Sequence, residues 1–289
     1  MTEGNGRLHG QTVLITGATS GIGEVAAHQL AGMGARVVIV ARSPEKGAQT
    51  MASIQKTTGS QAVELLLADL SAQADIRRLA AEFKAGHDRL DVLVNNAGVF
   101  NLSRELSRDG IEMTWATNHL NYFLLTNLLL DVLKASAPAR IVNVSSDAHR
   151  GGSIRFDDLG GAEKYSSWQA YSQSKLANVL FSYELARRLT GSGVTVNALH
   201  PGFVRTNFAR NNGRFSRLLV PIFQLAAISP EKGAETMVYL ASSPEVAGVS
   251  GSYFDKKKAV RSAEASYDEA VARQLWEVSA QMVGLETAV

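Results

Sequence analysis

Residues 12–23 read TVLITGATSGIG, in which a short apolar run ends in a glycine-rich turn, and a helical pattern continues from this turn through Met33. Gly17 suits a tight turn, Gly21 lets backbone amides approach a pyrophosphate, and Gly23 permits close packing of a helix on a sheet. The spacing is G-x-x-x-G-x-G, whereas the more familiar turn has G-x-G-x-x-G. Because the turn joins a strand to a helix, it predicts a dinucleotide-binding site.

Further apolar runs, short and rich in β-branched residues, recur along the chain. They occupy residues 37–40, 63–67, 92–94, 141–144 and 194–199. Stretches of helical period separate them, for example 72–83 and 177–189. Strands without polar alternation are buried on both faces, and the spacing leaves room for crossover helices. The sequence therefore predicts an α/β fold with a doubly wound parallel sheet, the Rossmann fold, in a single domain over residues 1–289.

Composition narrows the class of protein. The chain has 289 residues with 45% hydrophobic content, enough for one large core, and no linker or repeat divides it. The net charge of +2 is small, and apart from the lysines at 256–258 the charges are interspersed, so nucleic acid is not an expected partner. The absence of cysteine excludes disulfides, thiolate nucleophiles and cysteine-based metal sites. Residues 1–7 are expected to form a frayed tail.

No segment has the pattern of a membrane anchor. The N-terminus lacks the apolar region of a signal peptide, and no apolar stretch reaches about 18 residues. The longest candidate, 120–133, is interrupted by Asn121, Asn127 and Asp131, so it is expected to be a buried helix. We therefore expect a soluble, cytoplasmic protein without a membrane span.

The histidines are not spaced as metal ligands. The chain contains His9, His28, His87, His119, His149 and His200. None forms an H-x-x-x-H pair, so no metal is expected. His119 is expected to be a hydrogen-bonded core residue, and His149 is a candidate for the wall of a substrate pocket.

The end of the second apolar run indicates which dinucleotide binds. An NAD-selective site would be expected to carry an acidic residue there, but the chain has Ala41 followed by Arg42. A guanidinium suits a 2′-phosphate, so we predict NADP(H) as the cofactor; the alternative is that Arg42 is a solvated loop residue. Asp69 and Leu70 follow the third run, and Asp69 either lies near the adenine amino group or caps the next helix.

Tyr171 and Lys175 form a possible acid–base pair. Residues at i and i+4 share one helical face, so the Lys175 ammonium is expected beside the Tyr171 phenol. A phenol titrates near pH ~10, and shifting this to about neutral pH takes about 4 kcal/mol. One charge about 4 Å away at an effective dielectric of ~20 supplies about that much. The pair predicts proton exchange with an alcohol or carbonyl, although the same spacing also occurs on solvated helices.

Several motifs occur in a fixed order behind the glycine turn. They are NNAG at 95–98, Asn118, Ser146, Tyr171, Lys175 and the Pro201-Gly202 pair. Together they resemble the short-chain dehydrogenase/reductase family from about residue 10 to residue 254.

The resemblance implies a hydride transfer between a nicotinamide and a carbonyl or alcohol. Tyr171 is then the acid/base, Ser146 holds the substrate oxygen, Lys175 lowers the tyrosine pKa and binds the ribose, and Asn118 anchors a water that relays protons to Lys175. The cofactor-binding residues expected on this basis, together with the glycine-turn reading, are Gly17, Thr19, Ser20, Gly21, Ile22, Gly23, Arg42, Asp69, Leu70, Asn96, Ala97, Gly98, Tyr171, Lys175, Pro201, Gly202, Val204 and Thr206.

Ser145 and Ser146 compete for one role. Side chains alternate across a strand, so only one of the two faces the cleft. By similarity to the family we assign this role to Ser146 and expect Ser145 to brace the backbone.

The segment before Tyr171 is longer than in the shortest family members. The extra residues, about 151–168, together with DAH at 147–149 and LHPG at 199–202, resemble the retinol-dehydrogenase branch, whose members act on apolar aldehydes and alcohols. We expect no N-terminal membrane anchor like that of the animal enzymes, and this expectation argues against a retinoid substrate. Trp168 is expected either as a pocket wall or in the core.

An apolar stretch at 203–228 is expected to form a lid over the nicotinamide, which favours an apolar substrate; the alternative is packing in the core or between subunits. An amphipathic helix at about 267–283 is expected to close the sheet or make a subunit contact. The partner expected is a small carbonyl or alcohol, the protein being a monomer or a homo-oligomer. The other functional class considered is a non-catalytic NADP(H)-binding sensor or scaffold. Reduction of an enone or action on a sugar nucleotide would keep the same fold.

Overall fold

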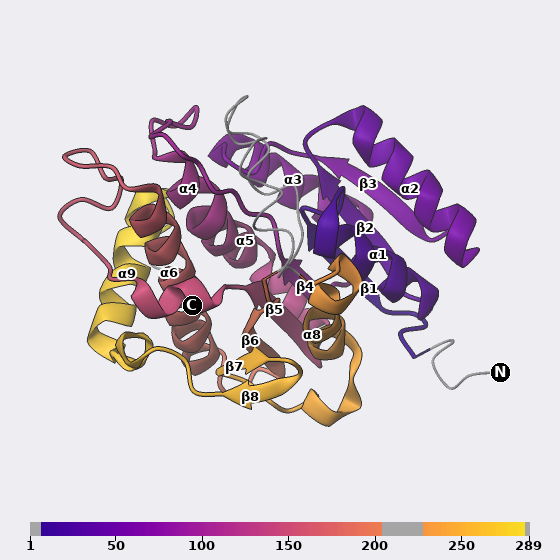
Figure 1. Ribbon diagram of the computed structural model, residues 1–289. Helices are drawn as coiled ribbons and strands as arrows, with labels where there is room; N and C mark the ends of the chain where they lie inside the picture. Colours follow the sequence, from indigo (N-terminus) through magenta and orange to yellow (C-terminus); the bar gives the residue numbers. More distant parts are fainter. Residues whose placement is uncertain (1–6, 204–227, 287–289) are drawn as a thin grey trace.

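The computed structural model describes residues 7–203 and 228–286, and these build a single sheet flanked by helices (Figure 1). The strand order is β3-β2-β1-β4-β5-β6-β7-β8. All neighbouring strands are parallel except β7 and β8, which are antiparallel. The strands are Thr12–Thr16 (β1), Arg36–Ala41 (β2), Val63–Leu67 (β3), Val92–Asn95 (β4), Ala139–Val144 (β5), Val194–His200 (β6), Ser252–Asp255 (β7) and Lys258–Val260 (β8). The order changes direction at β1, so the fold is the predicted doubly wound sheet.

Helices cover both faces of this sheet. The α-helices are Gly21–Gly32 (α1), Pro44–Thr58 (α2), Gln73–Gly86 (α3), Met113–Trp115 (α4), Asn121–Ala135 (α5), Ser167–Arg188 (α6), Pro230–Ser242 (α8) and Glu269–Met282 (α9). A π-helix, Ala116–Leu120 (η1), joins α4 to α5, and the 3-10 helices are Asp147–Gly151 (η2), Pro244–Val246 (η4) and Glu264–Tyr267 (η5). One face carries α1, α2 and α8, and the other carries α3, α5, α6 and α9.

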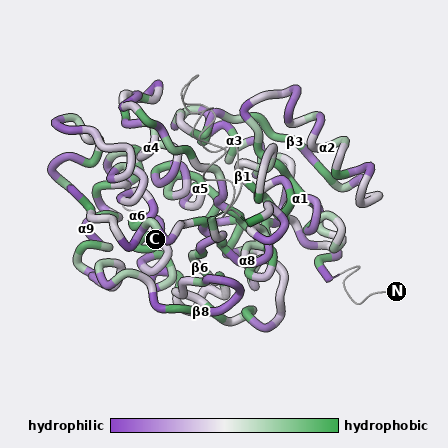
Figure 2. The backbone as a smooth tube through the Cα atoms, in the orientation of Figure 1, coloured by the Kyte–Doolittle hydropathy of each residue, from purple (hydrophilic) through white to green (hydrophobic). Residues whose placement is uncertain are grey.

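The core has two layers because each strand points its side chains to both faces. Leu14 belongs to the cluster under α3, α5 and α6, whereas Val13 and Ile15 belong to the cluster under α1 and α8. This explains why the apolar runs lack polar alternation. Hydrophobic segments are concentrated at the central strands, and hydrophilic segments lie along the outer loops (Figure 2).

Local signals in the sequence fix the helix ends. The Ser43 hydroxyl accepts a hydrogen bond from the Lys46 amide, and Pro44 opens α2. Gly59 ends the same helix with φ +74°, a left-handed conformation that glycine adopts without strain.

The six strands expected from the apolar runs are confirmed as β1 to β6, with bounds that differ by at most two residues. The buried helix expected at 120–133 is confirmed as α5. Strands β7 and β8 and the π-helix were not expected. The segment 1–6 of the expected tail and residues 204–227 of the expected lid lie outside the described residues.

The C-terminal helix expected at about 267–283 is present as α9. Trp276 of α9 is buried and contacts the rings of Phe123 in α5 and Phe181 in α6. Its apolar face therefore joins the core cluster formed by the sheet, α5 and α6, and the alternative of a subunit contact stays a prediction. No helix within 7–203 and 228–286 is long and apolar enough to cross a membrane.

Candidate active site

The polar signals of the sequence meet at one edge of the sheet, because the carboxyl ends of parallel strands lie together. The turn after β1 packs directly on the turn after β4. The Asn96 side-chain amide donates to the carbonyls of Thr16, at 2.8 Å, and Gly17, at 3.1 Å. The Thr16 hydroxyl in return accepts from the backbone amides of Asn96, at 2.9 Å, and Ala97, at 3.1 Å. The NNAG motif therefore holds the glycine turn in place.

The glycines of this turn are required by space and by conformation. Gly17 has φ +66°, and a Cβ there would lie 2.9 Å from the Ala97 Cα atom. A Cβ on Gly23 would overlap the Gly17 carbonyl oxygen and the Asn96 amide. Gly21 has φ +59° at the first position of α1.

The start of α1 fits a dinucleotide pyrophosphate. The first amides of a helix have no partner within the helix, and the Ser20 side chain, at the N-cap, accepts no bond from them. Their donors and the helix dipole therefore favour an anion at this position. Thr19 and Ile22 lie half-buried in the same turn.

The loops after β2 and β3 bring a cation and a carboxylate near each other. Arg42 is exposed, and its charge acts on Asp69. Burial opposes ionisation of Asp69, but hydrogen bonds from Ser71 and the charges of Arg42 and Arg108 keep the pKa of this carboxyl below its ordinary value. Asp69 does not cap α3, because Ala72 is at the N-cap; it accepts from the amide, at 3.1 Å, and the hydroxyl, at 2.7 Å, of Ser71. Leu70 is a core residue.

The expected catalytic residues lie together where β5 ends and α6 begins. Ser146 follows β5, and Tyr171 and Lys175 lie in the first turns of α6. The Ser146 hydroxyl lies near enough to the Tyr171 phenol to favour the ionised form of that phenol. The Lys175 Nζ atom lies 5.6 Å from the centre of the Tyr171 ring and donates to the Val144 carbonyl at 3.1 Å. The ring of Phe100 meets the Tyr171 ring edge-on at 5.5 Å between centroids.

Burial is the largest influence on the pKa values of Tyr171 and Lys175. It raises the pKa of Tyr171 to about 12, although the Ser146 hydroxyl acts in the opposite direction. It lowers the pKa of Lys175 to about 7. The pair alone had predicted a phenol that titrates near neutral pH, whereas burial raises the pKa of Tyr171 in this arrangement.

Ser145 and Ser146 point in different directions, as expected for neighbours on a strand. The Ser145 hydroxyl is buried and donates to the Lys175 carbonyl at 2.7 Å. Ser146 is half-buried and carries the contact to Tyr171.

The Asn118 side chain is used to hold a loop. Its oxygen accepts from the Val99 amide at 2.7 Å, and its nitrogen donates to the Val99 carbonyl and the Ser174 hydroxyl, both at 3.0 Å. The Asn118 carbonyl accepts from Asn178 at 2.9 Å. The water relay expected on Asn118 stays a prediction. A Cβ on Gly98 would lie 3.3 Å from the Asn118 oxygen and 3.6 Å from Lys175 Nζ.

Beyond β6 the chain turns sharply at Pro201-Gly202. Gly202 has φ +85°, and a Cβ there would lie 2.5 Å from the Ile228 side chain. Val204 and Thr206, both expected to bind the cofactor, lie outside the described residues.

The insert at 151–168 folds back on the start of α6. The Gln173 side chain accepts from the Arg155 amide at 2.8 Å and donates to the Leu159 carbonyl at 3.0 Å. Trp168 is 58% exposed, so its expected place in the core is wrong.

Two histidines behave as buried hydrogen-bonding residues. His119 bonds the Ser279 hydroxyl at 2.8 Å, and burial lowers its pKa to about 4, as expected for a satisfied core histidine. His149 bonds the backbone on both sides of its ring, which the sequence did not indicate. Within the described part of the chain, no three histidine, aspartate or glutamate side chains gather as metal ligands would.

Comparison with known proteins agrees with this geometry. The short chain dehydrogenase family matches residues 11–216. Human retinol dehydrogenase 13 is 48% identical over 285 residues, which cover 96% of this chain and 86% of that protein. A crystal structure of an uncharacterized protein from Mycobacterium paratuberculosis is 36% identical with a TM-score of 0.79, covering 97% of this chain and 96% of that one. An active-site complex of RhlG with NADP from Pseudomonas aeruginosa is 29% identical with a TM-score of 0.69. The match covers 88% of this chain and 97% of the RhlG chain.

Proposed function

Since the chain belongs to the short-chain dehydrogenase family of oxidoreductases, we propose that it interconverts a carbonyl and an alcohol on an apolar small molecule, with NADP(H) as cofactor and Tyr171 as the acid/base. The observation that carries the proposal is the buried Lys175 beside the Tyr171 phenol ring, with Ser146 near enough to the same phenol to favour its ionised form. Three residues of the required chemistry meet at the edge where the glycine turn lies.

The nicotinamide, when bound, supplies or accepts the hydride. The residues expected to hold the cofactor are those of the glycine turn, Gly98 and Lys175, because the positive φ angles and the open start of α1 leave room for a pyrophosphate. The Gly98 position is narrow, since any side chain there would press on Lys175 and Asn118.

In the reductive direction Tyr171 donates a proton to the carbonyl oxygen. Because burial raises the pKa of Tyr171 to about 12, the residue is a phenol at neutral pH, which is the form that donates. Ser146 hydrogen-bonds the substrate oxygen and supports the phenolate that remains after transfer. With a pKa of about 7, Lys175 is partly ionised near neutral pH, and its charge near the ring stabilises that phenolate.

The preference for NADP(H) rests on Arg42. Its guanidinium lies after β2, where the ribose of a dinucleotide would be expected, and the residue before it, Ala41, has no carboxylate to bind ribose hydroxyls. The complex of RhlG with NADP supports the same cofactor.

An apolar substrate is supported by the surroundings of Tyr171. Phe100 lines the phenol ring, and Phe203, 58% exposed, follows Gly202 at the same sheet edge. A relative is named for retinol, an apolar alcohol, so retinaldehyde belongs among the test substrates. No observation favours the non-catalytic alternative, because the chain keeps Ser146, Tyr171 and Lys175.

The test is oxidation of NADPH in the presence of retinaldehyde, straight-chain aldehydes and aryl ketones, followed as loss of absorbance. Deuterium from labelled NADPH should appear on the carbinol carbon of the product. Tyr171→Phe, which keeps the ring but removes the proton, should reduce kcat by about 10²–10⁴-fold while NADPH still binds. Tight binding of NADPH with no turnover of any carbonyl would overturn the proposal.

A further inference from the structure

His149 connects the backbone of Ser146 to a distant segment of the chain. Its Nδ1 atom lies 2.7 Å from the Ser146 carbonyl oxygen, and its Nε2 atom lies 2.9 Å from the Ala263 amide nitrogen. The ring is fully buried and packs on Tyr253 at 4.6 Å between centroids. A single imidazole therefore spans from the loop after β5 to the segment between β8 and α9.

The two partners fix the tautomer of this ring. A backbone amide can only donate, so Nε2 must accept from Ala263 and carries no proton. A carbonyl can only accept, so Nδ1 must carry the proton and donate to Ser146. The ring is neutral in this arrangement, and burial lowers the pKa of His149, which favours the same form.

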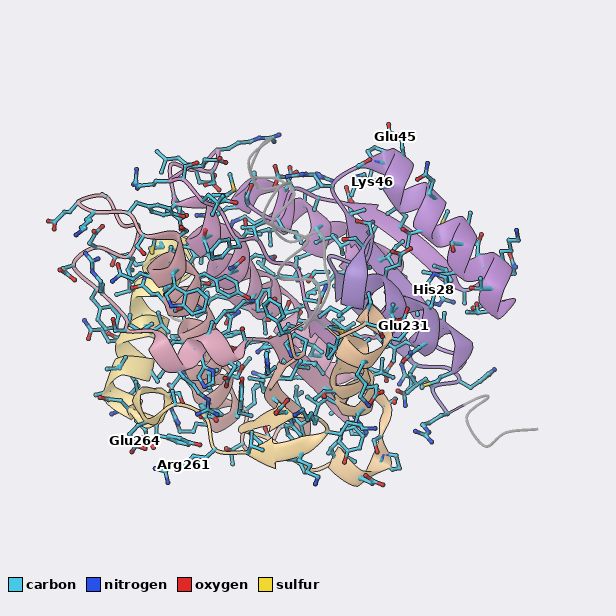
Figure 3. All side chains as sticks on the ribbon, viewed as in Figure 1. His28, Glu45, Lys46, Glu231, Arg261 and Glu264 are labelled. Carbon is cyan, nitrogen blue, oxygen red and sulfur yellow. The ribbon has the colours of Figure 1, made fainter. Side chains whose placement is uncertain are left out.

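A second contact ties the same two segments together. Arg150 donates to the Arg261 carbonyl at 2.8 Å and pairs with Asp147 at 2.6 Å. Figure 3 shows Arg261 and Glu264 in the segment that leads from the β7–β8 hairpin toward α9. The loop that carries Ser146 is therefore anchored to a part of the chain more than 100 residues away.

The bond from His149 holds the backbone of Ser146, to which the serine side chain is attached. The Ser146 carbonyl accepts from both the His149 ring and the His149 amide, the latter at 3.1 Å. The Ser146 hydroxyl accepts from the Ala148 amide at 3.2 Å and favours the ionised form of the Tyr171 phenol. Both the backbone carbonyl and the side-chain hydroxyl of Ser146 are therefore held by hydrogen bonds within this loop.

We propose that His149 is a positioning residue, which holds the Ser146 backbone through its Nδ1 proton so that the serine hydroxyl meets the substrate oxygen and Tyr171. The proposal rests on the proposed function, because it assigns a role within the same site. A misplacement of about 1 Å in a catalytic group can cost about 10²-fold in rate, so this role has a measurable kinetic effect.

Two substitutions at His149 distinguish the role of Nδ1 from the role of Nε2. The amide of asparagine can place an N–H near the position of Nδ1, whereas glutamine reaches the position of Nε2. His149→Asn should therefore keep kcat within about threefold of wild type, and His149→Gln should lose about 10–100-fold. KM and Kd for NADPH should stay unchanged in both. A merely structural role would lower stability without this asymmetry in kcat.

The tautomer can be measured without any turnover. In wild-type protein with ¹⁵N-labelled histidine, the imidazole shifts of His149 should show a protonated Nδ1 and an unprotonated Nε2 at neutral pH; His149→Asn identifies the signals. The opposite tautomer or a charged ring would overturn the proposal, as would full kcat in His149→Gln. If wild type reduces no carbonyl, the proposed function fails, while the ¹⁵N shifts still decide whether His149 holds the Ser146 carbonyl.

Discussion

The Lys175 ammonium lies 5.6 Å from the centre of the Tyr171 ring, at the inner end of the site, and its side chain is almost completely buried. Burial therefore penalises the charged form of both residues, and it moves the two pKa values apart, Lys175 to about 7 and Tyr171 to about 12. The site gains an acid and a nearby cation at the expense of folding stability.

Replacing Lys175 should stabilise the fold while removing activity. The ordinary pKa of lysine, 10.5, exceeds the folded value of about 7, so the unfolded chain binds more protons between these pH values. Wild-type stability should therefore rise with pH across this window and be lowest below it. Lys175→Met should be about 2 kcal/mol more stable than wild type at pH 6.5, and the difference should shrink toward pH 10.

Urea unfolding at pH 6.5 and pH 9 measures this difference. Lys134→Met is the matched control, because Lys134 is exposed on α5 and its replacement should change stability by less than about 0.5 kcal/mol at either pH. A Lys175→Met variant less stable than wild type at pH 6.5 would contradict the assignment.

Alanine substitutions of the two adjacent serines should have different effects, one on kcat and the other on stability. Ser146→Ala removes the hydroxyl that favours the ionised form of Tyr171 and is proposed to hold the substrate oxygen, so kcat should fall by about 10²–10³-fold with little change in melting temperature. Ser145→Ala removes the buried bond to the Lys175 carbonyl, so it should cost about 1–2 kcal/mol of stability and leave kcat within a few-fold. Near-full turnover in Ser146→Ala would show that this serine is not the one that acts.

Gly23 should tolerate no side chain. A Cβ would overlap the Gly17 carbonyl and the Asn96 amide, so Gly23→Ala should cost about 2–4 kcal/mol and weaken NADPH binding. Gly86→Ala is the control: this glycine ends α3, has nothing within 4 Å of an added Cβ, and should be neutral or up to about 1 kcal/mol more stable. Equal unfolding midpoints for the two variants would contradict the packing described for the glycine turn.

His119 should contribute to acid unfolding. Its folded pKa of about 4 lies below the ordinary 6.5, so the folded protein binds fewer protons in this interval and its stability is lost as pH falls from 6.5 toward 4. His119→Gln should reduce this loss, in unfolding measured at pH 7 and pH 5, by about 1–2 kcal/mol. His9→Gln, at an exposed position, should leave the pH dependence as in wild type.

The features that the sequence predicted correctly depend on local pattern. Buried parallel strands need continuous apolar runs, so β1 to β6 could be predicted from the sequence. The short strands β7 and β8 contain too few residues to form a recognisable pattern. The order of Ser146, Tyr171 and Lys175 is readable because each follows a recognisable strand or helix. The bridge from His149 to Ala263 could not be predicted, because it joins segments that are far apart in the sequence. The π-helix around Asn118 had no signal in the sequence pattern.

The direction of the pKa shifts of Lys175 and Tyr171 also could not be predicted from the sequence. Spacing showed that Lys175 lies near Tyr171, and a charge at that distance predicted a lower phenol pKa. Burial of both groups reverses the sign, and burial depends on how α6 packs against β5 and η1.

Arg42 provides the sharpest test of the cofactor. The residue is exposed directly after β2, and Glu45 and Lys46 mark the start of the next helix, α2, in Figure 3. A charge-assisted bond from its guanidinium to a 2′-phosphate would contribute about 1.5–3 kcal/mol, so Arg42→Ala should lower kcat/KM for NADPH by about 10–100-fold. The value for NADH should change little, because NADH has no phosphate at this position.

Another exposed arginine, Arg36, serves as a control that separates recognition of the phosphate from a change in overall charge. Arg36 begins β2 at the opposite edge of the sheet and pairs with Glu64 at 3.4 Å. Arg36→Ala changes the net charge by the same amount, so it should leave the ratio of kcat/KM for NADPH and NADH unaltered. If wild type uses NADH as efficiently as NADPH, or if both variants lower the ratio equally, Arg42 does not recognise the phosphate and the preference for NADP(H) is wrong.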